Sequence, residues 1–446
     1  MLGLLFVGVL MAALDIAIVA PALPAIRTAF GVDERAVAWV LTAYILCNLI
    51  GTPVMATLSD ARGRRSIYTL AVALFAAGSL VVALANRFDV LIAGRALQGF
   101  GAGGIFPVAT AVIGDVVPID RRGRALGMIG AVFGVAFLIG PLLGGVLLLA
   151  GWPLLFLINL PIAAFVIARS QKLLPAVPTA VRRGVDVFGL GLLSVALFTL
   201  AIGLNGIDAG HFSTTFDRVW PFLTVAAVAF PVFWWRERLA REPVIRPELF
   251  QSRQIVIASG LALGAGLSEA AIAFVPALMV TAFQVTSSRA AFMLLPIVLA
   301  MAVGAPLSGR LLDRHGARVV VMAGCALIGA GMILVGVLVP AVPSFYGAGI
   351  VIGLGLAALL GSSLRYVMLN EAPRDQRGAA QGILTLFTSV GQLLGAAAVG
   401  ALVASHGGAL AGYDLAFEAV GSFMLVLAVA AVALKKRGAE LATARV

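Results

Sequence analysis

The chain has 446 residues, of which 61% are hydrophobic and only 11% are charged. This composition excludes an ordinary soluble domain, in which about a quarter of the residues carry a charge, and it predicts an all-α integral membrane protein. The two cysteines, Cys47 and Cys325, both lie inside apolar runs, which argues against a disulfide framework and against a zinc site. The net charge of +11 is a reason to consider nucleic-acid binding, which the positions of the basic residues then test.

Apolar runs of about 20 residues, long enough to cross the hydrocarbon core as a helix, recur along the whole chain. The first run contains Asp15 and lacks both a basic leading region and an Ala-x-Ala-like end, so we interpret it as a permanent helix and not as a signal peptide. In total we expect fourteen membrane-spanning helices, at residues 3–24, 38–58, 66–85, 90–113, 124–149, 152–169, 185–205, 217–235, 254–282, 290–311, 318–340, 344–368, 378–404 and 413–434.

Lys and Arg gather on one side of these predicted helices. With a cytoplasmic N-terminus, 24 of the 31 basic residues fall in the cytoplasmic loops and tail, five fall outside, and Arg95 and Arg365 lie within spans. This asymmetry follows the positive-inside rule, and it predicts a multi-pass protein of the inner (plasma) membrane with both termini cytoplasmic. The basic charge is then explained by topology, and we expect no nucleic-acid partner.

Two charged loops recur at an interval of a little more than half the chain. Residues 56–65 (ATLSDARGRR) match residues 309–318 (GRLLDRHGAR), and residues 118–127 (PIDRRGRALG) match residues 373–382 (PRDQRGAAQG). Two matched halves around a central site are typical of transporters. The repeat predicts four parts, namely an N-terminal six-helix bundle (1–170), a linker with two extra spans (171–249), a C-terminal six-helix bundle (250–434) and a cytoplasmic tail (435–446).

Two acidic residues lie in the middle of predicted spans, at equivalent places in the two halves, because Glu269 follows Asp15 by 254 residues. An ionised carboxylate in the bilayer costs at least about 3 kcal/mol, so such residues are candidates for carrying protons. The alternative for Asp15 is a structural role, bonded to nearby helix ends or hydroxyls. Glu269 has no basic residue within a helical turn, so we expect it to be protonated or paired with a cation, with a place in the core as the alternative.

Two arginines also fall inside spans. Arg95 precedes Gln98 and Gly99, and near Asp15 or a water chain it would favour the anionic form of a carboxyl group. The alternative is that its guanidinium reaches back to the outer surface. Arg365 lies nearer the cytoplasmic end of its span, and we expect it to snorkel to that surface.

Several stretches resemble the motifs of one family, the major facilitator superfamily. Residues 60–65 resemble its loop between helices 2 and 3, residues 95–104 (RALQGFGAGG) its helix-4 motif, and residues 134–145 (GVAFLIGPLLGG) its helix-5 antiporter motif. Residues 14–26, 152–161 and 242–250 are similar to signatures of its fourteen-helix drug:proton antiporter branch, the EmrB/QacA-like proteins. The resemblance implies the major facilitator fold, with two six-helix bundles and two extra central helices. It also implies proton coupling through Asp15 and Arg95. For Glu269 the prediction of a proton carrier or a cation receptor rests on its unpaired place in the middle of a span.

The charged turns are predicted to form a cytoplasmic gate, because charges at facing helix ends interact with one another and with the helix dipoles. The alternative is that they only set the topology, which would explain the arginines but not the repeated Asp and Gly. The first loop departs from the family pattern at Ala56 and Ala61, where the family has Gly and Arg. The predicted gate residues are Asp60, Arg64, Arg65, Asp115, Asp313, Arg314 and Arg318.

The helix-5 motif contributes Gly134, Gly140, Pro141, Gly144 and Gly145, which permit close helix contact and remove one backbone hydrogen bond. We expect a bend that serves a moving helix, with a static packing face as the alternative. Ring faces and amides are also predicted to line a cavity for lipophilic cations, although each of these residues could equally face lipid or the core. The candidates are Trp39, Asn48, Gln98, Phe106, Phe274, Met279 and Gln392.

These observations predict a secondary active transporter that exports lipophilic or cationic drugs in exchange for protons by alternating access. The chain has no Walker A motif, so we expect the proton gradient to supply the energy, without a cofactor or metal. The alternatives are a dedicated exporter or a symporter of one endogenous metabolite, or a membrane enzyme or receptor. An enzyme is disfavoured because the three histidines lie far apart, in or near loops. The expected partners are a small amphipathic substrate, protons and the lipid bilayer, and the need for a periplasmic adaptor stays open.

Overall fold

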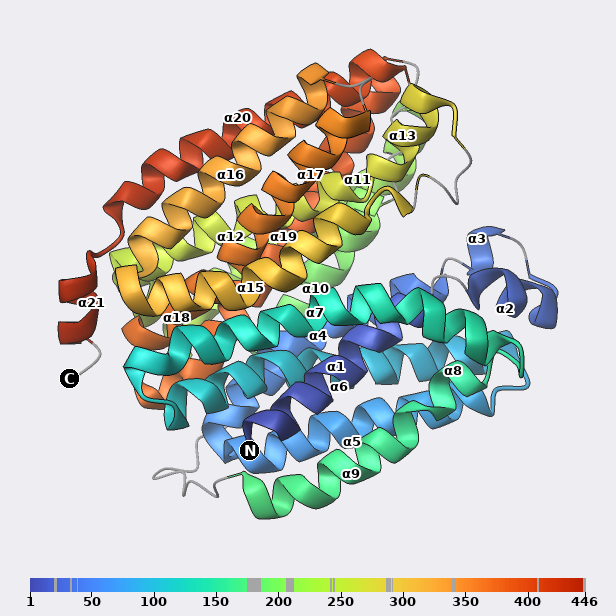
Figure 1. The fold of residues 1–446 in the computed structure, drawn as a ribbon. Coiled ribbons are helices and arrows are strands. Elements are labelled where there is room, and N and C mark those ends of the chain that lie inside the picture. Colours follow the sequence, from blue (N-terminus) through green and yellow to red (C-terminus); the bar gives the residue numbers. More distant parts are fainter. Residues whose placement is uncertain are drawn as a thin grey trace.

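The computed structural model describes residues 1–19, 22–32, 34–37, 39–174, 186–205, 212–240, 243, 245–285, 290, 292–338, 342–406 and 409–443. These residues form helices and turns and no strand, so the predicted all-α class is confirmed. The helices are arranged in two bundles that follow the two halves of the chain (Figure 1).

The N-terminal bundle is built from six long helices and three short ones. The long helices are α1 (Leu2–Val19), α4 (Trp39–Arg62), α5 (Arg64–Ala83), α6 (Phe88–Val116), α7 (Ile119–Leu148) and α9 (Asn159–Leu173). The short helices are α2 (Leu23–Phe30), α3 (Glu34–Val37) and α8 (Leu154–Leu157).

The C-terminal bundle repeats this plan with more interruptions. Its helices are α12 (Arg253–Ile272), α13 (Val275–Phe283), α15 (Leu295–His315), α16 (Ala317–Leu338), α17 (Val342–Leu356), α18 (Leu364–Glu371), α19 (Arg377–Ser405) and α20 (Leu410–Ala430). A π-helical segment, η4 (Ala357–Ser363), joins α17 to α18. The 3₁₀ turn η5 (Arg374–Gln376) precedes α19, and the 3₁₀ turn η6 (Ala431–Ala433) follows α20. The short helix α21 (Arg437–Thr443) comes last.

Two helices lie between the bundles in sequence, α10 (Val187–Asn205) and α11 (Phe212–Leu239), followed by the 3₁₀ turn η3 (Pro247–Gln251). Helix α10 packs against α11, against α4 of the N-terminal bundle and against α19 of the C-terminal bundle. It therefore contacts both halves.

Twelve of the described helical stretches are long and apolar enough to cross a membrane. Two of the fourteen predicted spans, 124–149 and 185–205, are helical but are not among the twelve. They correspond to α7, with 30 residues, and α10, with 19 residues. The structure therefore supports a multi-pass membrane protein with about twelve spans, and the count of fourteen is not established by these helices.

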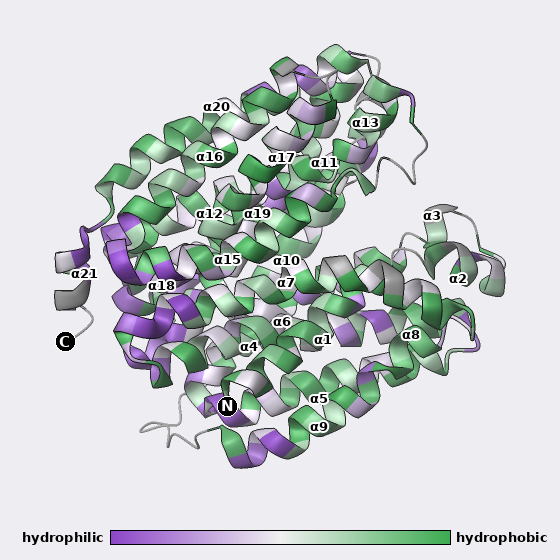
Figure 2. Cartoon of the chain, in the orientation of Figure 1, coloured by the Kyte–Doolittle hydropathy of each residue, from purple (hydrophilic) through white to green (hydrophobic). Residues whose placement is uncertain are grey.

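Hydrophilic residues gather at one end of the molecule, around α18 and α21 (Figure 2). This charged end contains the turns between α4 and α5, α6 and α7, α15 and α16, and α18 and α19. The start of α1 and the short helix α21 lie toward the same end (Figure 1). The loops that repeat in the sequence are therefore brought together in space.

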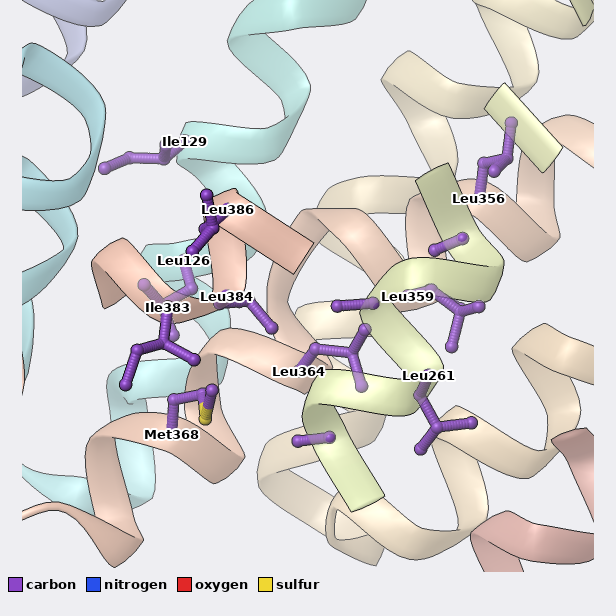
Figure 3. Packing of buried hydrophobic residues seen from close by; sticks show 14 of the residues in the cluster. Leu126, Ile129, Leu261, Leu356, Leu359, Leu364, Met368, Ile383, Leu384 and Leu386 are labelled. Atoms are coloured by element: carbon purple, nitrogen blue, oxygen red, sulfur yellow. The ribbon is translucent and has the colours of Figure 1, made fainter. Parts of the chain in front are cut away.

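The two bundles contact each other closely near the charged end. A Cβ atom added at Gly127 would overlap the carbonyl oxygen of Ala305, and one added at Gly309 would overlap that of Gly123. Small residues thus let the backbones of α7 and α15 approach each other. An apolar cluster adjoins this contact, with Leu126, Ile129, Leu364, Met368, Ile383 and Leu384 among its members (Figure 3).

Candidate functional site

Asp15 of α1 is fully buried and is held by three donors from α6 and α9. The Arg95 Nη1 atom donates to Oδ2 at 2.7 Å, and the Gln98 Nε2 atom donates to Oδ1 at 2.6 Å. The Asn159 Nδ2 atom donates to Oδ1 at 3.0 Å. Arg95 and Gln98 reach the same carboxylate because residues three apart lie on one face of a helix. The charge of Asp15 is therefore neutralised within the N-terminal bundle.

Arg95 is also fully buried, so the interpretation that its guanidinium reaches the outer surface is wrong. Its Nε atom donates to the carbonyl oxygen of Val40 at 2.9 Å, and its guanidinium lies 4.3 Å from the centre of the Tyr44 ring. Phe156 contributes a second ring, at 5.7 Å. These contacts enclose the ion pair between the start of α4 and α8.

Three members of this network were missed from the sequence: Tyr44, Ser79 and Asn159. The Ser79 hydroxyl accepts hydrogen bonds from Gln98 at 2.9 Å and from Asn159 at 3.3 Å. Asn159 could have been found, because it is a polar residue inside the apolar stretch 152–161 that carries part of the family resemblance. Tyr44 and Ser79 are common residues in membrane helices and give no comparable signal.

Glu269 of α12 is surrounded differently. Its Oε2 atom accepts a hydrogen bond of 2.9 Å from Nε2 of Gln392 in α19, and the residue is partly exposed. The described residues place no Lys, Arg or His within ion-pair distance of this carboxylate. Arg365 attracts it electrostatically. Glu269 is thus oriented by an amide, and its charge has no direct protein counter-ion in the described part of the chain.

Arg365 does not snorkel, because only 8% of its surface is exposed. Its guanidinium lies 3.9 Å from the centre of the Phe106 ring in α6, across the boundary between the bundles. Its Nη1 atom lies 3.4 Å from the Gln381 amide oxygen, and its Nε atom is buried without an acceptor among the described residues. The expectation failed because η4 immediately precedes α18. A π-helical segment changes the direction in which the following side chains point relative to a regular α-helix.

The remaining candidates for a drug cavity fall in different environments. Phe106 lies under Arg365 and Gln392 holds Glu269, whereas Gln98 is buried in the Asp15 network. Asn48 in α4 and Phe274 at the junction of α12 and α13 are partly exposed. Trp39 is 43% exposed at the start of α4, and Met279 is 0% exposed within the apolar core.

At the charged end, Asp60 and Asp313 make the same contact in opposite directions. Asp60 of α4 accepts the backbone N–H groups of Gly378 at 2.9 Å and Ala379 at 2.6 Å, in the first turn of α19. Asp313 of α15 accepts those of Gly123 at 2.8 Å and of Arg124 at 2.9 Å, close to the start of α7. Each carboxylate thus binds the positive end of a helix dipole that belongs to the other half.

Asp115 links the halves through two arginines. The Arg64 Nε atom and the Arg377 Nη1 atom both lie 3.0 Å from its carboxylate oxygens, and Arg64 also forms an ion pair with Asp60. In the matching place, Arg122 Nη1 donates to the Asn370 amide oxygen at 2.7 Å. Arg122 and Arg377 were missed as gate residues, although the repeat places both at an offset of 255.

The other predicted gate residues do not join this cross-half network. Arg65 donates to the carbonyl oxygen of Gln171 at 3.1 Å within the N-terminal half, and Arg314 and Arg318 are exposed and partly exposed. Ala317 stands where the first repeat has Arg64, and its N–H group donates to Glu440 of α21 at 3.0 Å. The two charged turns have therefore diverged in how they are held.

The glycines of the helix-5 motif place α7 in close contact with two neighbouring helices, α15 and α1. A Cβ atom at Gly134 would meet Ala302 of α15, in the other half, whereas one at Gly140 would overlap Ala17 of α1. Gly144 approaches the carbonyl oxygen of Ile18, and Gly145 has open space beside it. Pro141 lies within the same continuous helix. The tight contacts show close packing, and the expected rocking of α7 remains a prediction.

Residues 5–233 and 256–444 match the family model described as the Major Facilitator Superfamily. The chain belongs to the Major Facilitator Superfamily. Its members are transporters and not enzymes, so the enzyme alternative is excluded.

Two relatives illustrate the range of names within this superfamily. The uncharacterised MFS-type transporter YfiU of Bacillus subtilis is 30% identical over 401 residues, which cover 88% of this chain and 77% of the relative. The multidrug resistance protein Stp of Mycobacterium tuberculosis is 30% identical over 411 residues, covering 89% of this chain and 74% of the relative. Against the first three relatives, the chain spans between 58% and 77% of their length.

A solved structure shows the same superfamily fold. The human organic anion transporter MFSD10 (TETRAN) superposes with a TM-score of 0.71, covering 96% of this chain and 98% of that one, at 19% sequence identity. The two structures therefore share their overall fold over almost their whole lengths, and the division into two six-helix bundles stays a prediction.

Proposed function

We propose that this chain is a proton-coupled antiporter that exports lipophilic or cationic compounds across the plasma membrane by alternating access. The observation that carries the proposal is the pair of acids at equivalent places in α1 and α12. Of these, Glu269 is partly exposed and, among the described residues, is bonded only by an amide. A membrane carboxylate with no bound counter-ion favours the uptake of a proton or a cation. The name of the relative Stp supports drugs as the substrate class.

The same proposal includes fourteen membrane spans, as in the EmrB/QacA-like branch. Helix α7 has 24 uncharged residues after its last arginine, Arg124, and α10 has no charged residue. Both are therefore suited to cross a bilayer. With these two added, both termini lie on the side that carries most of the basic residues, which the positive-inside rule makes cytoplasmic.

In this mechanism Glu269 exchanges a proton for the substrate, and the Asp15–Arg95 pair responds to protonation within the N-terminal bundle. Protonation of Asp15 would weaken its ion pair with Arg95 and so loosen the contact of α1 with α6 and α9. Substrate entering from the cytoplasm would displace the proton from Glu269 by competing for the same negative group. No cofactor or metal has a role in this cycle.

The charged end supplies the cytoplasmic gate in this proposal. Asp60 and Asp313 each bind the N-terminus of a helix in the opposite half, and Asp115 joins Arg64 to Arg377. These contacts would hold the cytoplasmic side closed while the opposite side is open. Their separation would be required for substrate entry.

The experiment uses proton release from the purified protein in detergent. Addition of a cationic dye such as ethidium to the wild type is expected to release protons in weakly buffered solution, because dye and proton compete for Glu269. The Glu269→Gln variant is expected to release none and to have no proton-driven export in vesicles, although it still inserts in the membrane. Glu248→Gln, in η3 outside the bundle core, is the matched control. Full export by Glu269→Gln would reject the proposal.

A second candidate is an exporter or symporter dedicated to one endogenous metabolite. Arg365 favours it, because a buried arginine can recognise one defined anionic group. A host strain stripped of its own exporters would separate the two candidates. Resistance to several unrelated cationic dyes and antibiotics supports the antiporter, whereas unchanged sensitivity to all of them supports the dedicated transporter.

A further inference from the structure

Arg365 is a buried cation whose charge is not neutralised by direct contact with any carboxylate in the described residues. Only 8% of the residue's surface is exposed, and the guanidinium faces the Phe106 ring on one side. Among the described residues it donates one long hydrogen bond, to Gln381. Removing such a group from water costs several kcal/mol unless it is paired and hydrogen-bonded. In the N-terminal bundle, by contrast, the buried Arg95 forms an ion pair with Asp15 at 2.7 Å.

The free edge of the guanidinium has the shape of a carboxylate receptor. The bond to Gln381 uses Nη1, whereas Nε is buried without an acceptor among the described residues. The edge formed by Nε and Nη2 is one of those with which arginine binds both oxygens of a carboxylate in two parallel hydrogen bonds. The Gln381 amide donates to the carbonyl oxygen of Arg365 at 3.1 Å and so fixes the position of this residue from α19.

A polar stripe on α19 connects Arg365 with Glu269. Gln381, Thr385, Thr388 and Gln392 are spaced at four, seven and eleven residues, which places them on one face of the helix. The first of them contacts Arg365, and the last, about 16 Å further along the axis, holds Glu269. Both threonine hydroxyls donate to their own helix, and both residues are partly exposed. Opposite charges are thus placed at the two ends of one polar helix face.

We propose that Arg365 binds the carboxylate of an amphipathic zwitterionic substrate whose cationic group approaches Glu269. This inference rests on the proposed function and narrows its substrate class from lipophilic cations to compounds that also carry a carboxylate. Phe106 places an aromatic surface from the N-terminal bundle against the guanidinium, so both halves contribute to the site. A carboxylate at Arg365 satisfies the buried Nε atom, and a cation near Glu269 takes the place of the exchanged proton.

The test compares two dyes that differ in one group. A rhodamine with a free benzoate and its methyl ester share the cationic xanthene ring, and only the former has a carboxylate. For the wild type we expect binding of both, measured by fluorescence anisotropy of the purified protein, and export of both from cells. The Arg365→Gln variant is expected to lose about tenfold or more in affinity for the free acid, as befits a charged hydrogen bond, and less than about twofold for the ester.

Two further variants separate recognition from structure. Arg365→Lys keeps the charge but not the planar fork, so its affinity for the free acid should lie between those of the wild type and Arg365→Gln. Arg121→Gln removes an exposed arginine whose ion pair among the described residues is with Asp120 at 3.6 Å, and it should change neither affinity. A thermal melt of each variant reports any loss of folding.

The outcomes distinguish this inference from the proposed function. If Arg365→Gln loses the same affinity for both dyes, or loses affinity for neither, the assignment of Arg365 is overturned. A wild type that binds the ester alone overturns it as well. If Glu269→Gln exports the ester as well as the wild type does, the proton-coupled antiporter is rejected instead. The anisotropy measurement still tests carboxylate binding in that case, because it does not depend on transport.

Discussion

The two membrane acids occupy equivalent places in the repeat but have different surroundings. Asp15 is 0% exposed and bound to an arginine and two amides, whereas Glu269 is partly exposed and bound to one amide. One charge is neutralised by an ion pair within the protein, and the other has no direct counter-ion among the described residues. The repeat thus contains two equivalent positions, and the side chains around each one give them different surroundings.

The largest expected effect on stability comes from breaking the enclosed pair. Arg95→Gln leaves the Asp15 carboxylate buried without its counter-ion, which costs about 3 to 5 kcal/mol. We expect a marked fall in the melting temperature of the purified protein. The double variant Asp15→Asn with Arg95→Gln should recover part of this loss, because the unpaired charge is then gone. A single variant as stable as the wild type would show that Asp15 is not held by this pair.

Loss of the glutamine that binds Asp15 should lower the stability more than loss of the glutamine that binds Glu269. Gln98→Leu removes two donated hydrogen bonds from a fully buried network and should cost about 2 kcal/mol. Gln392→Leu removes the one bond to Glu269 at a partly exposed site and should cost about 1 kcal/mol. Melting curves of the two variants, prepared in the same detergent, test this order. Equal losses would mean that the two acids are equally dependent on their amides.

At the charged end, Asp60 and Asp313 are a second pair of equivalent acids with different surroundings. Asp60→Asn and Asp313→Asn each remove a charge from the N-terminus of a helix in the other half, which is worth about 1 kcal/mol. Asp60 also pairs with Arg64, whereas Ala317 takes that place beside Asp313, so we expect the larger effect for Asp60. Distances between spin labels on α4 and α19 should show that the charged ends of the two bundles are separated more often in Asp60→Asn than in Asp313→Asn. Identical distance distributions in both variants would contradict this asymmetry.

The smallest expected effect on stability belongs to the residue with the largest expected effect on transport. Glu269→Gln keeps a side chain of the same size and a hydrogen-bond partner for Gln392, so its melting temperature should change by less than the equivalent of about 0.5 kcal/mol. A large destabilisation would show that the ionised carboxylate is itself structural, and the contrast with Asp15 would disappear.

The sequence predicted the helices, the repeat and both acids because each depends on local composition or on a fixed interval. The apolar runs determine the helices, and the offset of 254 identifies Glu269 as the counterpart of Asp15. The failures concern partners that are distant in sequence. The environment of Arg365 depends on the π-helical segment before it and on Phe106 in the other bundle, and neither has a sequence pattern that specifies the contact.

The contacts at the charged end were predicted in part. The repeat predicted that Asp60 and Asp313 are equivalent, but not that each binds the helix N-terminus of the opposite half, because this depends on how the bundles dock. Arg122 and Arg377 could have been included, since the same repeat relates them. Asn159 could have been noticed as a polar residue in an apolar run. Arg65, Arg314 and Arg318 lie in the repeated turns, but a place in a repeated turn does not show which arginine contacts the other half.

The contact between α21 and the turn before α16 has a practical consequence for handling the protein. Glu440 accepts the N–H group of Ala317, and Arg437 donates to the carbonyl oxygen of Leu312 at 3.2 Å. An affinity tag or fluorescent fusion placed directly after α21, or a shortening that removes it, would disturb the turn beside Asp313. Expression trials should therefore compare tag positions, since a loss of yield from a C-terminal fusion would originate at this turn and not in the transport path.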